Sequence, residues 1–432
     1  MALPSGINKQ TGLQAALDEL RLSPHNVVGV GDAENDHVFL SACECGVAVA
    51  NALPSLKERA DIVTKADHGA GVAELIDHLV RHDLKSFDGV LKRHLITVGT
   101  RANGEPVKVR PYRGSVLFAG PSGSGKSTAA SALLESLADQ KYQFCLIDPE
   151  GDYENFMGAM QFGTHQNAPE LKQLLKALED PKQNAVVNLL GIVLEERPLF
   201  FASLFAQIID LRARTGRPHW IVVDEAHHML SSTWATAAAS ILHSVEGMIL
   251  ITVHPGSIAR PVLEHLEIAV AVGNEPQKTL SAVAKRLSVQ IPAIPSEPLK
   301  PGEGMIWCRG NGEAPLVAKL CTPRMERRRH LRKYAQGELG PDRSFYFRGP
   351  ENKLNLRAHN LQVFNTIAEG VDDETWLFHL RQGDYSRWFR EKIKDPDLAN
   401  EVQAIERAHD GDSQRSRQEI MKAVERYYTA AA

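Results

Sequence analysis

The chain has 432 residues, of which 43% are hydrophobic and 24% are charged, and its formal net charge is −4. This length predicts two or three domains, and the near-neutral charge excludes a polycation that binds nucleic acid or anionic membranes through bulk charge, although a local basic patch stays open. The five cysteines form no C-x-x-C pair, no apolar run approaches the roughly 18 residues of a membrane span, and the N-terminus lacks a signal-peptide pattern. We therefore expect a cytoplasmic protein without a disulfide framework, a zinc site or a membrane partner.

Residues 1–85 alternate helical and strand-like patterns. Leu13–Leu22 is amphipathic, a helix starts at Ser55, and apolar segments predict strands at Asn26–Gly31, Gly46–Ala50 and Ala60–Thr64. This alternation is typical of βαβ units and predicts a parallel sheet.

Four segments of this block, in order, resemble the C-terminal part of a haloacid dehalogenase-like (HAD) phosphatase of the sugar-phosphatase, Cof-like type. They are Gly6–Lys9 before a helix, Gly31–Asp36, Gly46–Ala52 and Ala60–Thr64. The resemblance implies that Lys9 stabilises a phosphoryl group and that Asp32 and Asp36 bind Mg²⁺.

The nucleophile of that family is the first aspartate of a D-x-D motif on an earlier strand. No strand-linked D-x-D occurs here, and Asp395-Pro-Asp397 lies in a polar helix start. Without the nucleophile the covalent phosphoaspartate route is lost. We expect the chain to be the latter part of a longer fusion or a naturally shortened product, with a Mg²⁺-dependent sugar-phosphate phosphatase as the alternative function of a longer chain only.

Residues 86–112 predict a linker that contains a hairpin, with strands at Ile96–Gly99 and Val107–Val109 and a turn at Asn103-Gly104. Residues 113–322 predict a second α/β domain. Its expected helices are Thr128–Leu137, Pro198–Arg212 and Trp234–Val245, and its expected strands are Val116–Ala119, Phe144–Ile147, Ala185–Leu189, Trp220–Val223, Met248–Val253 and Ile268–Val272.

A glycine-rich segment between the first of these strands and the following helix fits G-x-x-x-x-G-K-[ST]. Its residues are Gly120, Pro121, Ser122, Gly123, Ser124, Gly125, Lys126 and Ser127, followed by Thr128. Such a loop turns backbone N–H groups toward phosphate oxygens, and the helix N-terminus adds partial positive charge. We expect ATP here, with Lys126 on the β- and γ-phosphates and Ser127 on Mg²⁺.

The strand Trp220–Val223 ends in Asp224 and Glu225. A buried strand that delivers carboxylates at its C-terminal end predicts a Walker B strand, in which Asp224 holds Mg²⁺ and Glu225 orients or deprotonates the attacking water. Two adjacent acids favour hydrolysis over transfer of phosphate to another acceptor. The alternative interpretation is a strand that simply ends in solvated acids.

Three features resemble the HerA-like branch of the HerA/FtsK superfamily of P-loop motor ATPases. They are the P-loop, Asp148-Pro-Glu-Gly151-Asp152-Tyr153 after the second strand, and Asp224-Glu-Ala-His227. The family places a Thr-Gln pair that senses the γ-phosphate after a later strand, and here His254 stands where the glutamine is expected. His254 either contacts phosphate or water, with a charge that depends on pH, or simply ends the strand.

Two rival families lack a required motif in this sequence. An ABC transporter ATPase needs an L-S-G-G-Q-type signature, and a DEAH-box helicase needs a Q-x-x-G-R-x-G-R-type motif. The HerA-like resemblance implies a hexameric ring in which an arginine completes the neighbour's site, with Arg260, Arg286 and Arg309 as candidates.

Residues 323–432 predict a mainly helical accessory module with helices at Pro396–His409 and Arg415–Tyr428. The basic segment Arg324–Lys333 is either a phosphate-facing patch for nucleic acid or a solvated linker helix, which we favour. The aromatic stripe of Trp376, Tyr385, Trp388 and Phe389 predicts core packing.

These patterns together predict an α/β protein that binds and hydrolyses ATP with Mg²⁺. Its expected architecture is a P-loop NTPase parallel sheet, an N-terminal partial HAD-like Rossmannoid block and a helical C-terminal module. The ATPase is either a nucleic-acid motor or a regulatory ATPase that controls a phosphatase module.

Overall fold

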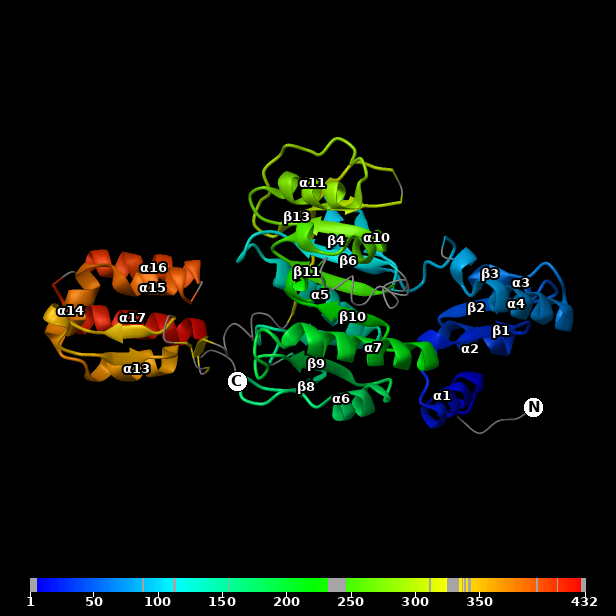
Figure 1. Cartoon of the computed structure of the whole chain (residues 1–432), viewed down its shortest axis with the longest axis horizontal. Coiled ribbons are helices and arrows are strands. Elements are labelled where there is room, and N and C mark those ends of the chain that lie inside the picture. The colour runs from blue at the N-terminus through cyan, green and yellow to red at the C-terminus, as the bar shows by residue number, and fades with distance from the viewer. Residues whose placement is uncertain are drawn as a thin grey trace. The chain divides into compact units, whose positions relative to one another are not determined.

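The computed structural model divides the chain into two compact units, Met1–Arg324 and Met325–Ala432, which are coloured by position along the chain in Figure 1. The structure describes residues 6–87, 89–111, 114–154, 156–231, 246–310, 312–324, 334–335, 337, 339–340, 343–393, 395–409 and 411–428.

In the described part of the N-terminal block, strands and helices alternate as expected for βαβ units. Its strands β1 (Val28–Gly31), β2 (Cys45–Ala48) and β3 (Ile62–Val63) pair in parallel in that order. The first strand begins two residues later than expected because Pro24–Asn26 forms a 3-10 turn capped by Ser23. The helices are α1 (Lys9–Leu20), α2 (His37–Ala42), α3 (Pro54–Arg59) and α4 (His68–His82).

A large sheet dominates the rest of the first unit. Among the described residues, eleven strands pair in the order β5-β4-β14-β13-β12-β6-β11-β10-β7-β9-β8. The strands are β4 (Ile96–Arg101), β5 (Pro106–Val109), β6 (Ser115–Ala119), β7 (Phe144–Asp148), β8 (Ala159–Phe162), β9 (Asn184–Asn188), β10 (Trp220–Val223), β11 (Met248–Thr252), β12 (Leu266–Ala271), β13 (Glu303–Cys308) and β14 (Leu316–Leu320).

The sheet is parallel from β12 to β8, as the sequence predicts for the strands that carry the motifs. At its other end β13, β14, β4 and β5 pair antiparallel. The segment expected as a linker therefore contributes its hairpin to this sheet, because β4 pairs with β14. The sequence analysis did not predict β8, β13 or β14.

Alternate residues of the central strands enter two cores, one on each face of the sheet. On β6, Leu117 packs in one cluster, whereas Val116 and Phe118 pack in the other. Helix α5 (Lys126–Asp139) covers one face, and α7 (Arg197–Thr215) packs into the opposite core. The remaining helices are α6 (Leu171–Leu178), α8 (Ala226–Met229), α10 (Arg260–Glu264) and α11 (Pro276–Leu287), and the helix expected at Trp234–Val245 lies outside the described residues.

The second unit packs helices around an aromatic core. Trp376, Tyr385, Trp388 and Phe389 are all buried, which confirms that the aromatic stripe is core. The elements are β15 (Phe345–Phe347), β16 (Leu356–Ala358), α13 (Leu361–Gly370), α14 (Asp373–Arg381), α15 (Asp384–Glu391), α16 (Pro396–Ala408) and α17 (Ser413–Tyr428). Asp395 caps α16 by accepting from the backbone N–H of Leu398.

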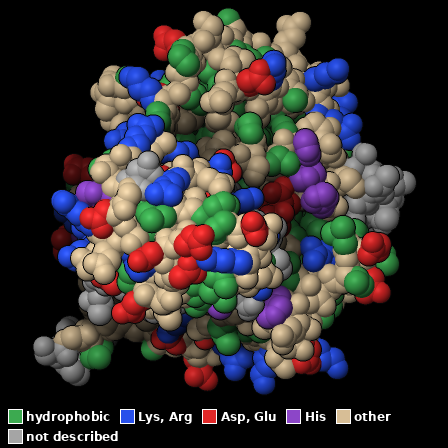
Figure 2. Space-filling view, turned by 90° about the vertical axis from the view of Figure 1, so that its left-hand side faces the viewer, with side chains coloured by type: hydrophobic (Ala, Val, Ile, Leu, Met, Phe, Trp, Pro, Cys, Tyr) green, Lys and Arg blue, Asp and Glu red, His purple; other side chains and the backbone are tan. Residues whose placement is uncertain are grey.

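Most of the basic segment Arg324–Lys333 lies outside the described residues. Arg324 itself faces acids of α5: its backbone N–H donates to Glu135 Oε2 at 2.7 Å, and its guanidinium pairs with Asp139. On the face drawn in Figure 2, the described Lys and Arg side chains are interspersed with Asp and Glu.

We predict that the second unit loses stability in acid through His379. The buried ring accepts at Nε2 from the backbone N–H of Arg348 (3.0 Å), and its Nδ1 lies 2.7 Å from Asp384 Oδ2. Burial, with a smaller contribution from Arg348, lowers the pKa of His379 to about 4. The unfolded chain protonates near the ordinary pKa of about 6.5, so the stabilisation is complete above that pH and is lost as the pH falls toward 4.

The measurement is hydrogen-exchange protection of α14 and α15 in the full chain at pH 7 and pH 5. Protection should fall with pH in wild type and fall less in His379→Gln, which keeps an acceptor for Arg348. His409→Gln serves as the control. His409 directly follows α16, and this variant should behave as wild type. Equal pH dependence in His379→Gln and wild type would contradict the assignment.

Candidate functional site

The motif residues of the large sheet lie at one edge. Strands β6, β7, β10, β11 and β12 run parallel, so their C-terminal ends meet at the same side of the sheet. The P-loop follows β6, Asp148 ends β7, and Asp224 follows β10. Because β11 lies between β6 and β10, the residues after β11 stand between the P-loop and the Walker B acids.

The P-loop has the backbone shape that a phosphate cradle needs. Gly120, Gly123 and Gly125 have φ of 155°, 75° and 93°, values that L side chains rarely adopt, and Gly125 is the N-cap of α5. A Cβ at Gly120 would lie 2.3 Å from the carbonyl oxygen of Val272. The loop therefore lies tightly against the end of β12, and the two other glycines have open space beside them.

Lys126 is the first residue of α5, and Ser127 and Thr128 follow in its first turn. The lysine is buried, and its Nζ donates to the carbonyl oxygen of Pro121 at 2.9 Å. The Ser124 hydroxyl donates to the same carbonyl at 2.7 Å, while Pro121 and Ser122 are exposed. The lysine ammonium thus lies against the loop whose N–H groups would hold phosphate.

Two buried acids end neighbouring strands. Asp148 is fully buried and accepts from the backbone N–H groups of Asp152 (3.0 Å) and Tyr153 (2.7 Å), so it organises its own loop. Asp224 is 3% exposed and accepts from the N–H of Glu225 at 2.9 Å. Burial, with the charges of Asp148, Glu225 and Asp152 adding to it, raises the pKa of Asp224 to about 8. A carboxylate in this setting is stabilised by a cation, which is the fit expected for Mg²⁺.

Glu225 adopts a left-handed backbone, with φ of 44°, which costs a non-glycine residue roughly 1–2 kcal/mol. Burial raises the pKa of its carboxyl, as does the charge of Glu150, while Lys126 opposes the shift. Its Oε2 lies 3.3 Å from His227 Nδ1. Strained backbone and a raised pKa at one residue are typical of a functional carboxylate.

His227 links Glu225 to the end of β11. Its Nδ1 lies 3.1 Å from the Thr252 hydroxyl, and that hydroxyl accepts from the backbone N–H of His254 at 3.0 Å. Burial, then the charges of His228, His254 and Lys126, lowers the pKa of His227 to about 4, so its ring is neutral near pH 7. The sequence analysis assigned no role to His227, although Asp-Glu-Ala-His was the available signal.

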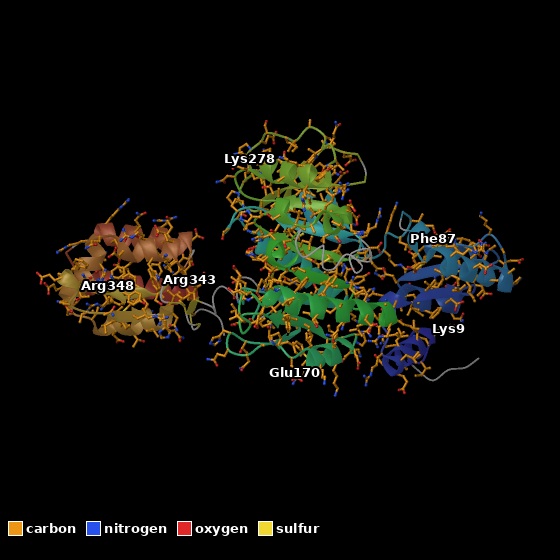
Figure 3. The ribbon with its side chains drawn as sticks, in the orientation of Figure 1. Lys9, Phe87, Glu170, Lys278, Arg343 and Arg348 are labelled. Carbon is orange, nitrogen blue, oxygen red and sulfur yellow. The ribbon has the colours of Figure 1, made fainter. Side chains whose placement is uncertain are left out.

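The structure thus gathers the P-loop, Asp224, Glu225 and His254 at one sheet edge, where the rings of His227 and His254 lie edge to face at 5.0 Å. The HAD-like residues lie elsewhere, in the N-terminal block. Asp36 is buried, pairs with Lys9 of α1 (labelled in Figure 3), and accepts from the N–H groups of Asp32 (3.0 Å) and Ala33 (3.1 Å). Asp32 is exposed.

Two family models match the chain. A model described as an AAA ATPase domain matches residues 101–251, which include the P-loop and the Walker B strand. A model described as a haloacid dehalogenase-like hydrolase matches residues 2–76.

The curated relatives match the N-terminal block. The phosphoglycolate phosphatase of Methanothermobacter thermautotrophicus is 46% identical over 70 residues, which are 16% of this chain and 32% of that protein. Phosphoglycolate phosphatase 2 of Saccharolobus solfataricus is 40% identical over 80 residues, which are 18% of this chain and 34% of that protein. The chain spans about a third of the length of these relatives.

Solved structures match about half of the chain. The genome packaging NTPase B204 of Sulfolobus turreted icosahedral virus 2, in complex with ATP-gammaS, has a TM-score of 0.37 and 18% identity, and the match covers 49% of this chain and 100% of that one. VirB4 of Thermoanaerobacter pseudethanolicus has a TM-score of 0.37 and 14% identity, and the match covers 52% of this chain and 96% of that one.

Among the described helices, none combines the length and the apolarity needed to cross a membrane. The chain carries a P-loop ATPase domain and part of a haloacid dehalogenase-like hydrolase domain.

We predict that Gly273→Ala weakens nucleotide binding although it lies outside the P-loop motif. Gly273 follows β12 with φ of 93°, and a Cβ there would lie 2.9 Å from Pro121 Cδ and 3.2 Å from Ser124 Cβ. The strain of roughly 1–3 kcal/mol would be relieved by moving the P-loop, so we expect about tenfold weaker binding of ATP-gammaS by titration calorimetry. Gly256→Ala, where a Cβ meets open space, is the control, and equal binding by both variants would contradict the prediction.

Proposed function

We propose that the chain hydrolyses ATP in a Mg²⁺-dependent reaction at this sheet edge, as a HerA-like P-loop ATPase. The observation that carries the proposal is that the P-loop lysine, a buried aspartate and a strained glutamate follow parallel strands of one sheet at the same edge. The AAA ATPase match over residues 101–251 supports the reaction class.

In the proposed site, the backbone N–H groups of residues 123–128 bind the phosphates, and the Lys126 ammonium neutralises charge on the β- and γ-phosphates. The Ser127 hydroxyl and the Asp224 carboxylate would hold Mg²⁺, which polarises the phosphate oxygens when bound. The raised pKa of Asp224 supports this role, because a cation relieves the cost of an ionised carboxylate in a buried position.

Glu225 is proposed to orient the attacking water and to accept its proton. A carboxylate whose pKa is raised is a stronger base than an exposed glutamate, and the charge of Lys126 opposes part of that rise. His227 is proposed as a positioning residue, since its Nδ1 lies 3.3 Å from Glu225 Oε2 and 3.1 Å from the Thr252 hydroxyl. The backbone N–H of His254 donates to the same Thr252 hydroxyl. We propose that the His254 side chain senses the γ-phosphate.

We predict that Lys126→Ala weakens ATP binding by about 100-fold, because it removes a charge-assisted contact with phosphate. Glu225→Gln should keep ATP binding and lower turnover by about 100-fold or more, because the amide cannot accept the proton. Binding is measured by calorimetry and turnover by phosphate release with Mg²⁺.

Glu150→Gln is the matched control for Glu225→Gln. Glu150 is exposed, and its charge raises the pKa of Glu225. We expect Glu150→Gln to turn over within about threefold of wild type, since an exposed charge acts weakly through solvent. Wild-type turnover in Glu225→Gln would reject the assignment of the base.

The proposal extends to assembly, in which a neighbouring subunit supplies an arginine. Arg286 Nε donates to the Ile258 carbonyl (2.8 Å), and Arg309 donates to three carbonyls of residues 263–266, so both are used inside their own subunit. Arg260 pairs with Glu264 at 2.9 Å, and its side chain is 53% exposed. Arg260 is therefore the strongest of the three candidates.

If Arg260 acts in a neighbour's site, specific ATPase activity should rise with protein concentration, and Arg260→Ala should lower turnover by about 1,000-fold without preventing ATP binding. Arg214→Ala is the control, because Arg214 makes a similar i,i+4 pair with Asp210 on an exposed helix face. A monomer by light scattering that has full activity would exclude both the ring and the arginine in trans.

Two proposals remain for the target of the ATPase. It is either a nucleic-acid motor or a regulatory ATPase for a phosphatase module. The Asp148–Tyr153 loop resembles the motor branch, which favours the first. ATPase activity that rises with added double-stranded DNA supports a motor, whereas activity unchanged by DNA supports the regulatory alternative.

The second candidate function is a HAD-type phosphatase, favoured by the 46% identity to a phosphoglycolate phosphatase. We predict that this chain has no such turnover, because Lys9, Asp32 and Asp36 supply charge and metal ligands but not the attacking aspartate. The assay uses sugar phosphates and a chromogenic phosphate ester with Lys126→Ala protein, which removes ATPase background. Robust release of phosphate that is lost in Asp32→Asn would overturn this prediction.

A further inference from the structure

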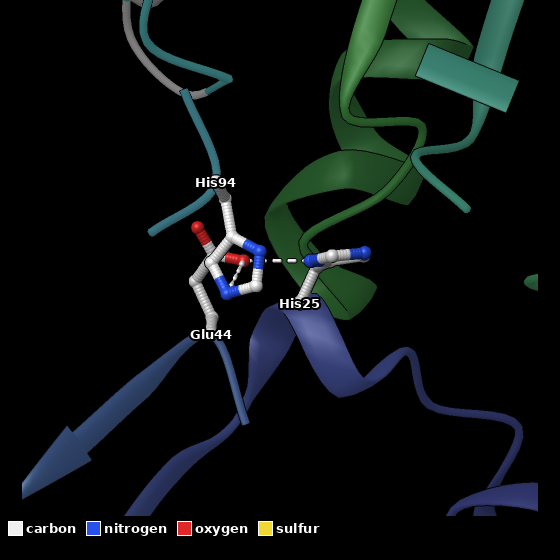
Figure 4. A group of neighbouring side chains, drawn as sticks. All are labelled: His25, Glu44 and His94. Carbon is white, nitrogen blue, oxygen red and sulfur yellow. Dashed lines mark hydrogen bonds and ion pairs between the residues drawn. The ribbon is translucent and has the colours of Figure 1, made fainter. Parts of the chain in front are cut away.

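A second group of metal-ligating side chains lies away from the ATPase site. His25 is in the 3-10 turn Pro24–Asn26, Glu44 directly precedes β2, and His94 lies two residues before β4. Their ligand atoms all lie within 4.8 Å of one another. His25 Nδ1 is 2.6 Å and His94 Nε2 is 3.9 Å from the same oxygen, Glu44 Oε2, as Figure 4 shows.

The three side chains are largely removed from solvent. The side chains of His25, Glu44 and His94 are 8%, 5% and 22% exposed. His94 Nε2 is buried without a hydrogen-bond partner, and burial lowers the pKa of this ring despite the opposing charge of Glu44. A neutral imidazole nitrogen with an unused lone pair therefore faces a buried carboxylate, which is costly unless another group joins them.

The contacts of His25 also leave a buried polar atom without a matching partner. Its Nδ1 faces the Glu44 carboxylate and its Nε2 lies 2.6 Å from the carbonyl oxygen of Gln140. Both partners only accept hydrogen bonds, but a neutral imidazole carries a single N–H. If Nε2–H donates to Gln140, the lone pair of Nδ1 faces the Glu44 carboxylate, and either a second ring proton or a cation bound by both groups would satisfy this contact. A metal-bound histidine commonly donates its other N–H to a backbone carbonyl in this way.

The surroundings of Glu44 complete such a site. The Tyr142 hydroxyl donates toward both carboxylate oxygens, at 2.9 and 3.1 Å, and the Tyr142 ring stacks on His25 at 3.8 Å between centroids. Burial lowers the pKa of the neighbouring His219 well below its usual value, so it adds no positive charge. The guanidinium of Arg93 pairs with Asp61, which offsets its repulsion of a cation.

We propose that His25, Glu44 and His94 bind one divalent transition-metal ion, with Zn²⁺ the best match. Two imidazoles and one carboxylate suit Zn²⁺, whereas Mg²⁺ prefers oxygen ligands alone. A tetrahedral Zn²⁺ site places ligand atoms about 3.3 Å apart, so on binding the 2.6 Å contact of His25 Nδ1 with Glu44 Oε2 would lengthen by about 0.7 Å and the 3.9 Å separation of His94 Nε2 would shorten by about 0.6 Å. Water supplies the fourth ligand.

The ion would join segments that are distant in sequence. His25 and Glu44 belong to the HAD-like block, whereas His94 leads into β4 of the large sheet, and Gln140 and Tyr142 lie between α5 and β7. A bound ion would therefore connect the HAD-like block to the ATPase sheet. This proposal is independent of the proposed ATP chemistry. The prediction that the chain has no zinc site rested on cysteine spacing, and this site uses no cysteine.

The test is a Zn²⁺ titration by calorimetry of the full chain after chelator treatment, with Co²⁺ absorption as a report on tetrahedral geometry. Wild type should bind one ion at this site with a Kd below about 1 µM. His94→Asn and Glu44→Gln should each weaken that binding by more than about 100-fold, and Tyr142→Phe, which removes only the supporting hydroxyl, by about 10-fold to 100-fold.

Two controls separate this site from other histidines. His409→Gln removes a His–Glu pair at 3.1 Å that offers only two side chains to a metal ion, and it should leave the titration unchanged. His254→Asn reports any ion held by the histidines of the ATPase site, and it should keep the binding that His94→Asn loses. Circular dichroism verifies that both cluster variants are folded.

The proposal is overturned if wild type binds no Zn²⁺ below about 10 µM, which would mean that a proton on His25 fills the gap. It is also overturned if wild type, His94→Asn and Glu44→Gln bind the same number of ions with equal affinity. Hydrogen exchange supplies an independent readout: Zn²⁺ should increase protection of residues 25–27 and 140–144 in wild type but not in His94→Asn.

Discussion

The parallel pairing of β6, β11, β10 and β7 is the constraint on which the rest of the site depends. Each strand is buried on both faces, so it can place a polar side chain only where it ends. Parallel pairing then brings those ends to a single edge. The P-loop, Asp148, Asp224 and His254 are thereby gathered from positions more than 100 residues apart along the chain.

This convergence creates an electrostatic conflict. Asp148, Glu225 and Asp152 lie close enough to raise the cost of ionising Asp224, while burial removes the water that would solvate it. Lys126 offsets part of this negative charge at Glu225. In the proposed function, a bound nucleotide with its metal ion would supply both the cation that Asp224 lacks and the anion that Lys126 would meet. A similar imbalance occurs at His25, Glu44 and His94, where buried hydrogen-bond acceptors outnumber the protons available to them.

The sequence was most informative where chemistry is local. The P-loop is one continuous segment with a strand before it and a helix after it, so its residues and its position could be predicted together. The strand β10 was predicted for the same reason, because four apolar residues precede Asp224 and Glu225. The burial of Trp376 and Tyr385 followed from the density of aromatic residues in one segment.

Features that depend on distant pairing were not predictable from the sequence. The antiparallel strands β13 and β14 join the hairpin to the large sheet through β4, and no local pattern reveals which strands will pair. His227 acquires its position from Thr252 on another strand. The group of His25, Glu44 and His94 spans about 70 residues without a recognisable spacing, so only the fold brings it together.

The most direct test of the central claim is an experimental structure of the Glu225→Gln chain with ATP and Mg²⁺. The account predicts that the β- and γ-phosphates bind the N–H groups of residues 123–128 and the Lys126 ammonium, with Mg²⁺ held by Ser127 and Asp224. Position 225 should face the γ-phosphate across a single water. A nucleotide bound away from the P-loop, or a γ-phosphate remote from positions 224 and 225, would contradict the account.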